Sequence, residues 1–461
     1  MQELAQFVVG TSFNVLSDST VRELKVRVLD SLGCAIGALE AEPVRMVRAQ
    51  LDDFGGNDRC TLVGGGKTAP DRAAFFNSAL VRYLDFNDSY LAKGETCHPS
   101  DNLGAVLAGA EYANASGKDL LVALAVAYQV QCRLSDLAPV RNKGFDHTTQ
   151  GSYAAAAGVS RALELDEERT ANAIAISGTA LNALRVTRTG RLSHWKSLAY
   201  PHTAFGATHN TFLAMRGISG PSEVFEGSKG FMDAIAGRFQ IDWSKEGLER
   251  VTRTILKKYN AEIHSQSTIE GALELKEEHR FRVEDIEKIE IETFDVAFNI
   301  IGGGEEGPKT EVRTKEEADH SLPYVIAVAL LDGTVMPEQY RPERIVREDV
   351  QQFLRRIVVR PKEDYSQRFP VEMPCRIIVQ SKDGHMFAKE KRDYEGFFTH
   401  PMRWEKALEK FDRLSAPYVS ESLRREIAKV IGRLESHRVV DLVRLLGRIH
   451  VPAKKKRRVK R

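Results

Sequence analysis

Residues 102–134, which read NLGAVLAGAEYANASGKDLLVALAVAYQVQCRL, decide the expected fold. The stretch contains two segments rich in Ala, Leu and Val, 102–113 and 118–134, with a short polar break between them. Small alanine side chains let neighbouring helices approach closely. We therefore expect helices that pack inside a helical domain, rather than helices that lie on a surface.

The same pattern extends on both sides of this stretch. In residues 20–39, apolar side chains recur every three or four positions and share one helical face, and Thr20 with Glu23 has the spacing of a capping box. Further helices are expected at 73–84, 151–163 and 167–183. Helical pattern returns at 404–414 and 420–445, a piece too short to form its own domain. These C-terminal helices are therefore expected to pack on the first domain.

Between about residues 280 and 395 the pattern becomes that of strands. Residues 286–292 alternate apolar and charged side chains, as a half-buried strand does. Residues 356–360 predict a second strand, and 376–379 with 386–388 predict a hairpin.

The expected fold class is mainly α with an α+β domain. We expect a large discontinuous helical domain, 1–258 completed by 400–450. A smaller α+β lid domain, 259–399, is inserted between its two parts, and we expect a cleft where the two domains meet. Residues 451–461 form a basic C-terminal tail.

Charge and composition restrict the function. The chain has 461 residues, 42% hydrophobic and 28% charged, which is typical of a globular protein of two or three domains. Its net charge is +2, and the last eight residues carry seven Lys or Arg, so the rest of the chain is at −5. That balance argues against nucleic-acid binding, because phosphate recognition needs a basic face on the folded domain. The tail alone leaves open a non-catalytic binding protein, with a solvated, frayed terminus as the simpler interpretation.

The cysteines and apolar runs point to a reducing, cytoplasmic setting without a membrane role. Five cysteines are odd in number, widely spread and never in a Cys-x-x-Cys pair, which argues against a disulfide framework and a cysteine metal site. The longest wholly apolar run, 120–128, is well short of the roughly 18 residues that would span a membrane. Gly64-Gly65-Gly66-Lys67 lacks the spacing of a phosphate loop and predicts a turn.

Five dense polar clusters lie at the edges of apolar helices. A His suits proton transfer near neutral pH, and a Lys in a cleft supplies a point charge for a carboxylate. Ser100 or Asp101 could simply cap the helix that begins near Asn102, and for Asp146 a cap is as good an explanation as a functional role. Taken alone, a His is more often structural, but for His147 we favour function. Five clusters together, in a chain without metal or nucleotide motifs, predict a catalytic site. Their main members are Asp85, Ser89 and His98; His147; Lys196; Lys257, Glu262 and His264; and His320 and Tyr324.

At these clusters the sequence resembles the MmgE/PrpD family, which includes 2-methylcitrate dehydratases, cis-aconitate decarboxylases and iminodisuccinate epimerases. The likeness runs from about Phe13 to Leu445. Its most specific motifs are Leu84-Asp85-Phe86-Asn87-Asp88 with His98-Pro99, Gly144-Phe145-Asp146-His147-Thr148-Thr149, His194-Trp195-Lys196, and Ala318-Asp319-His320-Ser321-Leu322-Pro323-Tyr324. The resemblance implies a helical domain built from both chain ends, a lid-like α+β domain, a homodimer, and an interdomain pocket that needs no metal or other cofactor.

Motif matching also implies the site residues. The catalytic set is Asp85, His98, His147, Lys196 and Tyr324, and the substrate-binding set is Ser89, Lys257, Glu262, His264 and His320. Ser89 stands where relatives carry Thr and keeps the hydroxyl. Glu262 stands where the decarboxylase branch carries a His, while His264-Ser265-Gln266 is similar to the methylcitrate dehydratase branch.

The resemblance therefore favours dehydration of 2-methylcitrate to 2-methyl-cis-aconitate, a step of propionate catabolism in the methylcitrate cycle. Decarboxylation of cis-aconitate and epimerisation of an acidic substrate remain alternatives. We expect Lys196, with Lys257 as a second contact, to offset the carbanion charge. His98, oriented by Asp85, and His147 are expected to share the base and acid roles, and Tyr324 to protonate the departing hydroxyl.

Overall fold

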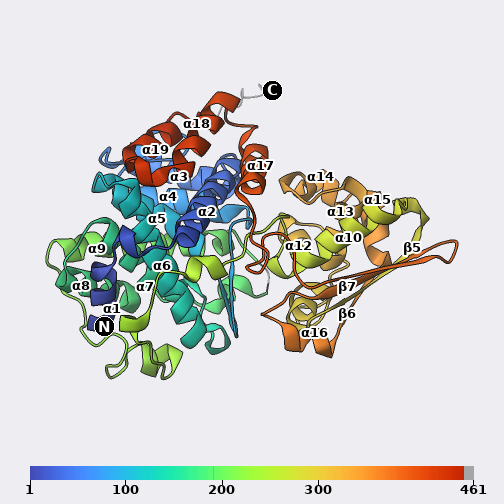
Figure 1. The fold of residues 1–461 in the computed structure, drawn as a ribbon, viewed down its shortest axis with the longest axis horizontal. Helices are drawn as coiled ribbons and strands as arrows, with labels where there is room; N and C mark the ends of the chain where they lie inside the picture. Colours follow the sequence, from blue (N-terminus) through green and yellow to red (C-terminus); the bar gives the residue numbers. More distant parts are fainter. Residues whose placement is uncertain (191, 451–461) are drawn as a thin grey trace, which may run out of the picture. The chain divides into compact units, whose positions relative to one another are not determined.

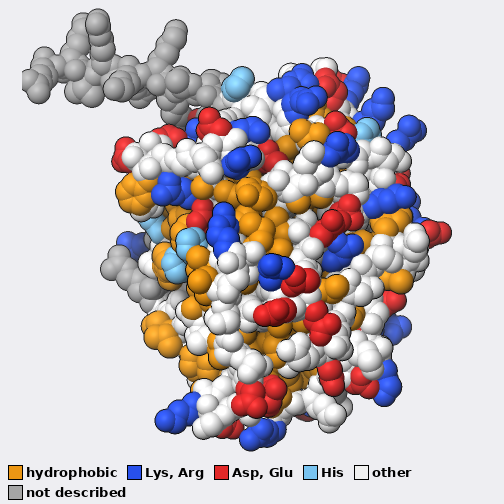
Figure 2. Space-filling model, turned by 90° about the vertical axis from the view of Figure 1, so that its left-hand side faces the viewer, with side chains coloured by type: hydrophobic (Ala, Val, Ile, Leu, Met, Phe, Trp, Pro, Cys, Tyr) orange, Lys and Arg blue, Asp and Glu red, His pale blue; other side chains and the backbone are white. Residues whose placement is uncertain are grey.

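The structure is a computed structural model that describes residues 1–190 and 192–450, and its chain divides into two compact units (Figure 1). The first unit comprises Met1–Thr254 and the chain from Arg403 onwards, and the second comprises Ile255–Met402. The basic tail, to which the binding alternative was assigned, lies outside the described residues. On the face drawn in Figure 2, Lys and Arg side chains are interspersed with Asp and Glu.

The first unit is built from helices contributed by both parts of the chain, as the sequence predicts. The strongest helix pairs are α6 with α7, α4 with α9 and with α5, and α17 with α2. The α-helices described in the first unit are α1 (Gln2–Gly10), α2 (Asp18–Gly37), α3 (Glu42–Phe54), α4 (Pro70–Tyr83), α5 (Leu103–Tyr112), α6 (Gly117–Leu137), α7 (Thr148–Ala162), α8 (Glu167–Ala180), α9 (Trp195–Met215), α17 (Trp404–Ser415), α18 (Glu421–Gly432) and α19 (Val439–Gly447).

Helices α5, α6 and α7 form the centre of this unit. A Cβ atom added at Gly158 of α7 would come within 2.8 Å of Val106 on α5 and 2.9 Å of Ala127 on α6, so the close approach requires a glycine. By length and composition α6 could cross a membrane, yet 83% of its most apolar window is buried within the protein. Core packing therefore accounts for its apolar residues.

Several helix boundaries lie up to three residues from the expected ones, and two further expectations are wrong. The N-cap of α2 is Ser17, whose side chain accepts a hydrogen bond from the main-chain N–H of Thr20 at 3.2 Å, so the predicted Thr20–Glu23 capping box is wrong. The segment expected as one helix, 420–445, is two: α18 ends at Gly432, and α19 begins at Val439 after a short 3-10 turn. Gly432 and Asp441, which accepts a hydrogen bond from Arg438 N–H at 3.0 Å, mark the break.

Two short hairpins interrupt the helices. The strands β1 (Cys60–Thr61) and β2 (Lys67–Thr68) are joined by three glycines, Gly64 to Gly66, with φ of 97°, 99° and 89°, which confirms the predicted turn. The strands β3 (Tyr90–Ala92) and β4 (Glu95–Cys97) pair with Tyr90 opposite Cys97. This register brings the residues just outside the hairpin, Ser89 and His98, side by side.

The second unit is a four-stranded mixed sheet covered by helices. The strand order is β6-β5-β7-β8, with β5 (Ile286–Thr293) parallel to β6 (Ile357–Pro361) and antiparallel to β7 (Cys375–Ser381), which pairs antiparallel with β8 (Met386–Lys391). Both predicted strands and the predicted hairpin are confirmed. Helices α10 (Gln266–His279) and α13 (Leu322–Asp332) contact each other and the sheet. The shorter helices are α11 (Asp295–Ala297), α12 (Lys315–Asp319), α14 (Pro342–Ile345), α15 (Glu348–Phe353) and α16 (Glu363–Arg368).

Candidate active site

The β3–β4 hairpin of the first unit presents His98 in a defined tautomer. Nδ1 of His98 lies 2.7 Å from the main-chain oxygen of Asp88 and 3.1 Å from Oγ of Ser89. Because a carbonyl oxygen can only accept, we assign the proton of the neutral ring to Nδ1 and the lone pair to Nε2. Asp88 and Ser89 therefore hold this ring through Nδ1, and the expected role of Asp85 in orienting the ring stays a prediction.

His147 converges on His98 from another segment, the loop before α7. The two imidazole ring centroids are 5.4 Å apart and meet edge to face. Nδ1 of His147 lies 3.3 Å from Oδ1 of Asp146. Nε2 of His147 is buried and makes no hydrogen bond to any described residue. A buried nitrogen with no partner in the protein is available to a polar group of a ligand.

The charges around His147 keep its ring neutral. Burial lowers the pKa of His147 to about 3; Asp146 opposes this shift, and the cations Arg188, Arg82 and Arg185 reinforce it. For Asp146, burial alone would raise the pKa, but Arg188, His147 and Arg185 outweigh it and hold the carboxyl pKa below its ordinary value. Asp146 also accepts a 3.3 Å hydrogen bond from Thr148 N–H, so it is both a helix cap and an ion-pair partner.

Lys196 lies in the first turn of α9 and is buried. Its Nζ is 3.5 Å from Oδ2 of Asp85, whose Oδ1 accepts a 2.8 Å hydrogen bond from Nη1 of Arg82. Nε of Arg82 is 3.6 Å from Oδ2 of Asp101. Asp85 also has a φ of 53°, a left-handed conformation that is uncommon outside glycine and that occurs often at functional sites. Its carboxylate thus lies between two cations, one on each oxygen.

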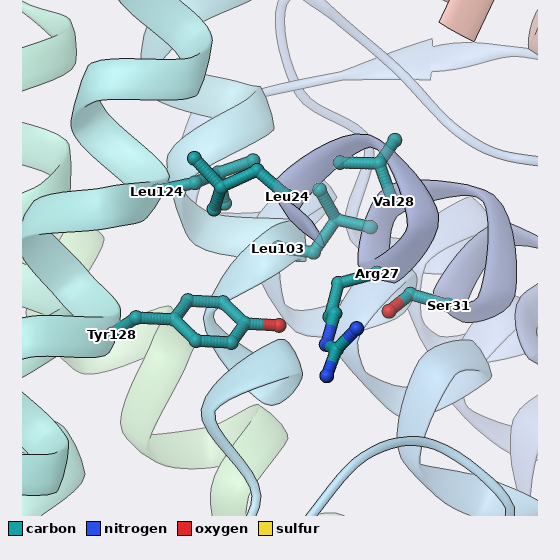
Figure 3. Close-up of a pocket in the computed structure, with 7 residues that line it drawn as sticks. All are labelled: Leu24, Arg27, Val28, Ser31, Leu103, Leu124 and Tyr128. Atoms are coloured by element: carbon teal, nitrogen blue, oxygen red, sulfur yellow. The ribbon is translucent and has the colours of Figure 1, made fainter. Parts of the chain in front are cut away.

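A buried network of hydrogen bonds around Asp88 holds the segment that precedes the β3–β4 hairpin. Oδ1 of Asp88 accepts hydrogen bonds from Ser100, at 3.0 Å from N and 2.6 Å from Oγ, and Oδ2 accepts one from the Tyr128 hydroxyl at 2.7 Å. Figure 3 shows the Tyr128 hydroxyl directed toward Arg27 beside a cavity of about 10 Å³, which is room for one water molecule. This cavity is too small for a polycarboxylate and belongs to the support of the site.

Asp101 belongs to the same network. Burial raises its pKa to about 7, with Arg82 opposing and Asp88 reinforcing the shift. Oδ1 accepts a 2.8 Å hydrogen bond from the side chain of Asn87. Asp101 is not the N-cap of α5, which is Asn102; it is the second carboxyl partner of Arg82.

The remaining predicted polar residues form a second cluster inside the second unit. Both oxygens of Glu262 bind His264, at 2.7 Å from its main-chain N–H and 2.7 Å from its Nδ1. Burial alone would raise the pKa of Glu262, but the nearby His264, His320 and Lys257 hold it below its ordinary value. Lys257 is only 2% exposed. Four of the predicted binding residues are thus brought together by the fold of one unit.

Tyr324 has a different environment from the one expected. Its ring is fully buried in the hydrophobic core of the second unit, and its hydroxyl donates a hydrogen bond to the main-chain oxygen of Gln339. Burial raises the pKa of this phenol above its ordinary value. The core packing gives Tyr324 a structural position.

Three arginines near the histidines were missed by sequence reasoning. Arg82 had a recognisable signal, because it is three residues before Asp85 at the end of a helix, a spacing that favours ion pairs. Arg185 and Arg188 had no recognisable sequence signal, because a polar loop with two arginines is usually solvated. Their partner Asp146 is close only in the folded chain, at 3.7 Å from Arg185 and 2.7 Å from Arg188.

Two histidines, a buried lysine paired with a carboxylate and three arginines define a site suited to acid–base chemistry on an anionic small molecule. Two family models match the chain, the MmgE/PrpD N-terminal domain over residues 2–244 and the MmgE/PrpD C-terminal domain over residues 259–436. The chain belongs to the MmgE/PrpD family.

Curated relatives agree with this assignment. The chain is 31% identical over 343 residues to the 2-methylcitrate dehydratase of Escherichia coli (strain K12), which covers 68% of each protein. It is 24% identical over 460 residues to the cis-aconitate decarboxylase of Mus musculus, covering 94% of this chain and 90% of that enzyme. It is 27% identical over 476 residues to a fungal alkylcitrate dehydratase, covering 94% and 91%. These relatives are lyases by name.

Proposed function

We propose that this protein is a hydro-lyase that dehydrates 2-methylcitrate to 2-methyl-cis-aconitate. The observation that carries the proposal is the 5.4 Å approach of the His98 and His147 rings in the unit that also holds the Lys196–Asp85 pair. Elimination of water from a 3-hydroxy acid needs a base at a carbon next to a carboxylate, together with fixed positive charge. These side chains supply both.

His98 is the base in this proposal. Its Nε2 lone pair takes the proton from the carbon next to the substrate carboxylate, while Nδ1 keeps its hydrogen bond to Asp88. The carbanion that develops beside a carboxylate is doubly charged, and the Lys196 ammonium offsets this charge. The protonated His98 then gives its proton to the departing hydroxyl, which leaves as water, so the ring ends the cycle neutral.

His147 has a different role because it is neutral at the start of the reaction. Its low pKa excludes it as a proton donor near neutral pH. Its buried, unpartnered Nε2 accepts a hydrogen bond from the substrate hydroxyl and holds it in line for departure. This assignment separates the two histidines, which the sequence left interchangeable.

Dehydration is favoured over decarboxylation by two observations. The E. coli relative at 31% identity is named a dehydratase, whereas the relative named a decarboxylase is 24% identical. Both oxygens of Glu262, which stands where the decarboxylase branch carries a His, are occupied by His264. This chain therefore lacks, at this position, the His of the decarboxylase branch.

The test is an assay with 2-methylcitrate, citrate and cis-aconitate as separate substrates. We expect ultraviolet absorbance of an unsaturated acid from 2-methylcitrate, and a loss of at least ~100-fold in turnover in His98→Asn. His385→Asn is the matched control, since that imidazole is 71% exposed in the β7–β8 turn. Release of CO₂ from cis-aconitate would identify a decarboxylase instead, and an undiminished rate in His98→Asn would remove His98 from the mechanism.

A further inference from the structure

We propose that Arg188 is a positioning residue of this site, whose guanidinium ties the segment of His147 to the segment of Lys196. Its Nε donates to Oδ2 of Asp146 at 2.7 Å, Nη2 to Oδ1 of Asp146 at 3.3 Å, and Nη1 to the main-chain oxygen of Lys196 at 3.1 Å. The inference rests on the proposed function, because it assigns Arg188 to the reaction of that site.

Arg188 contacts the residues that carry or border the two functional groups, the His147 imidazole and the Lys196 ammonium. Oδ1 of Asp146, which faces Nη2 of Arg188, also lies 3.3 Å from Nδ1 of His147. On the other side, the carbonyl that Nη1 binds belongs to Lys196, whose own Nζ lies 3.5 Å from Asp85. One planar, rigid guanidinium therefore links the carboxylate beside the His147 imidazole to the main chain from which the Lys196 side chain extends.

The loop that carries Arg188 is itself anchored to the loop of His147. The 3-10 turn η4 (Arg185–Arg188) follows an isolated β-bridge between Phe145 and Leu184. The main-chain N–H of Arg185 donates to Gly144 at 2.9 Å, and that of Asp146 donates to Ala183 at 2.8 Å. These bonds hold the arginine backbone in register with Asp146, so the guanidinium needs little ordering to reach both partners.

The positive charge of Arg188 has a second consequence for His147. With Arg188 in place, the Asp146 carboxylate is shared between the guanidinium and the imidazole, and the ring stays neutral. Removal of the cation leaves Asp146 free to stabilise an imidazolium, so the pKa of His147 should rise. The titratable and charged groups around His147 are Asp146, Arg82, Arg185, Arg188, His98 and Tyr200.

Lysine and glutamine at position 188 separate the positioning effect of Arg188 from the effect of its charge on the pKa of His147. Arg188→Lys keeps a positive charge but has one ammonium group, which cannot bind both carboxylate oxygens and the Lys196 carbonyl. Arg188→Gln removes the charge as well. We expect kcat to fall by about 10- to 100-fold in both variants, because small displacements of reacting groups are costly. Only Arg188→Gln should raise the titration midpoint of His147, by at least about one pH unit.

The titration is measured by NMR of ¹³C-labelled histidine, with the His147 signal assigned from His147→Gln, and kcat is measured with 2-methylcitrate. Arg344→Gln is the matched control. Arg344 is also buried and binds both oxygens of one carboxylate, Asp332, at 2.9 and 2.6 Å in the second unit. That variant should lose stability while kcat and the His147 titration stay unchanged.

An Arg188→Gln protein with wild-type kcat and a wild-type His147 titration would overturn the inference. If Arg188→Gln does not fold, Arg188→Lys decides by its kcat, since a merely structural arginine would leave kcat unchanged in a folded protein. If the wild-type protein turns over none of the three acids, the proposed function fails. The NMR titration would still report whether Arg188 controls His147.

Discussion

At the scale of single residues, the site depends on charges that are shared rather than paired one to one. Asp85 divides its two oxygens between Arg82 and Lys196. Arg188 contacts both oxygens of Asp146, and Oδ1 also lies close to Nδ1 of His147. Each buried carboxylate therefore contacts one functional group and at least one arginine, so that loss of the arginine changes the charge around the functional group.

The lowered pKa of His147 has a consequence for stability at acidic pH. The unfolded chain binds a proton at this ring near pH 6.5 and the folded protein only near pH 3, so the stability due to this group falls as the pH falls through that window. The expected slope is about 1.4 kcal/mol per pH unit. Urea unfolding of the wild type and His147→Gln between pH 7 and pH 4 measures it.

The difference between the two proteins is the decisive quantity in that experiment. Because the pKa of Asp101 is raised to about 7 in the folded protein, its contribution to the free energy of unfolding increases as the pH falls. This contribution opposes that of His147. Asp101 is present in both proteins, so its contribution cancels. Parallel pH curves for the two proteins would contradict the buried, neutral state of His147.

Residue identities could be predicted from the sequence to the extent that they follow from local patterns. Histidines and a lysine at the edges of apolar helices were recognisable without coordinates, and the fold brings His98 and His147 together. Arg188 was not recognisable, because its importance comes from contacts with Asp146 and with the main chain of Lys196. The hydrogen bond from the Tyr324 hydroxyl to Gln339 was not foreseen, because a sequence does not show which groups lie within reach of that hydroxyl.

At the scale of elements, helix contacts in the first unit are closer than ordinary side chains permit. Gly158 on α7 faces Val106 on α5 and Ala127 on α6, and there is no room for a methyl group between them. Because α7 begins directly after His147, the packing of this helix also sets the position of the imidazole.

Gly158→Ala should therefore destabilise the protein although alanine favours helices. The added methyl group must displace α5 or α6, at a cost of about 1 to 3 kcal/mol. Thermal unfolding by differential scanning calorimetry measures the loss. Gly10→Ala is the control, because a Cβ atom there meets no atom within 4 Å. A Gly158→Ala protein as stable as the wild type would show that these helices can separate freely.

Periodicity predicted many of the elements, but helices α1, α3, α9, α10 and α13 were not predicted, and further errors lie at element ends. Alternation in residues 286–292 identified β5, and apolar spacing identified α2, α4, α5, α6, α7 and α8. The cap of α2 was placed one turn late, because both Ser17 and Thr20 can cap a helix and only the folded geometry selects Ser17. The break between α18 and α19 was missed because both helices are strongly amphipathic.

At the scale of the whole molecule, the first unit is closed by a helix from the far end of the chain. Nζ of Lys410 on α17 lies 2.6 Å from Oδ1 of Asp30 on α2, and it donates to the main-chain oxygen of Phe86 at 2.7 Å. Both side chains are buried. Phe86 lies beside Asp85, so this long-range ion pair also contacts the segment that carries the site.

Lys410→Met should cost about 3 to 5 kcal/mol, because it leaves the Asp30 carboxylate buried without a cation. Asp30→Asn combined with Lys410→Met should recover part of that loss, since no buried charge then remains unpaired. The free energies of unfolding of the wild type, the two single variants and the double variant, measured in urea, form a double-mutant cycle. Strictly additive losses would mean that the two side chains do not interact.

The order of these segments along the chain matters during synthesis. A ribosome releases α6, the most apolar long helix of the first unit, well before it makes α17. The second unit, a continuous segment of 148 residues from Ile255 to Met402, emerges in between. The helical core of the first unit therefore stays incomplete until α17 to α19 are made, and during that interval its apolar helix faces lack their final partners.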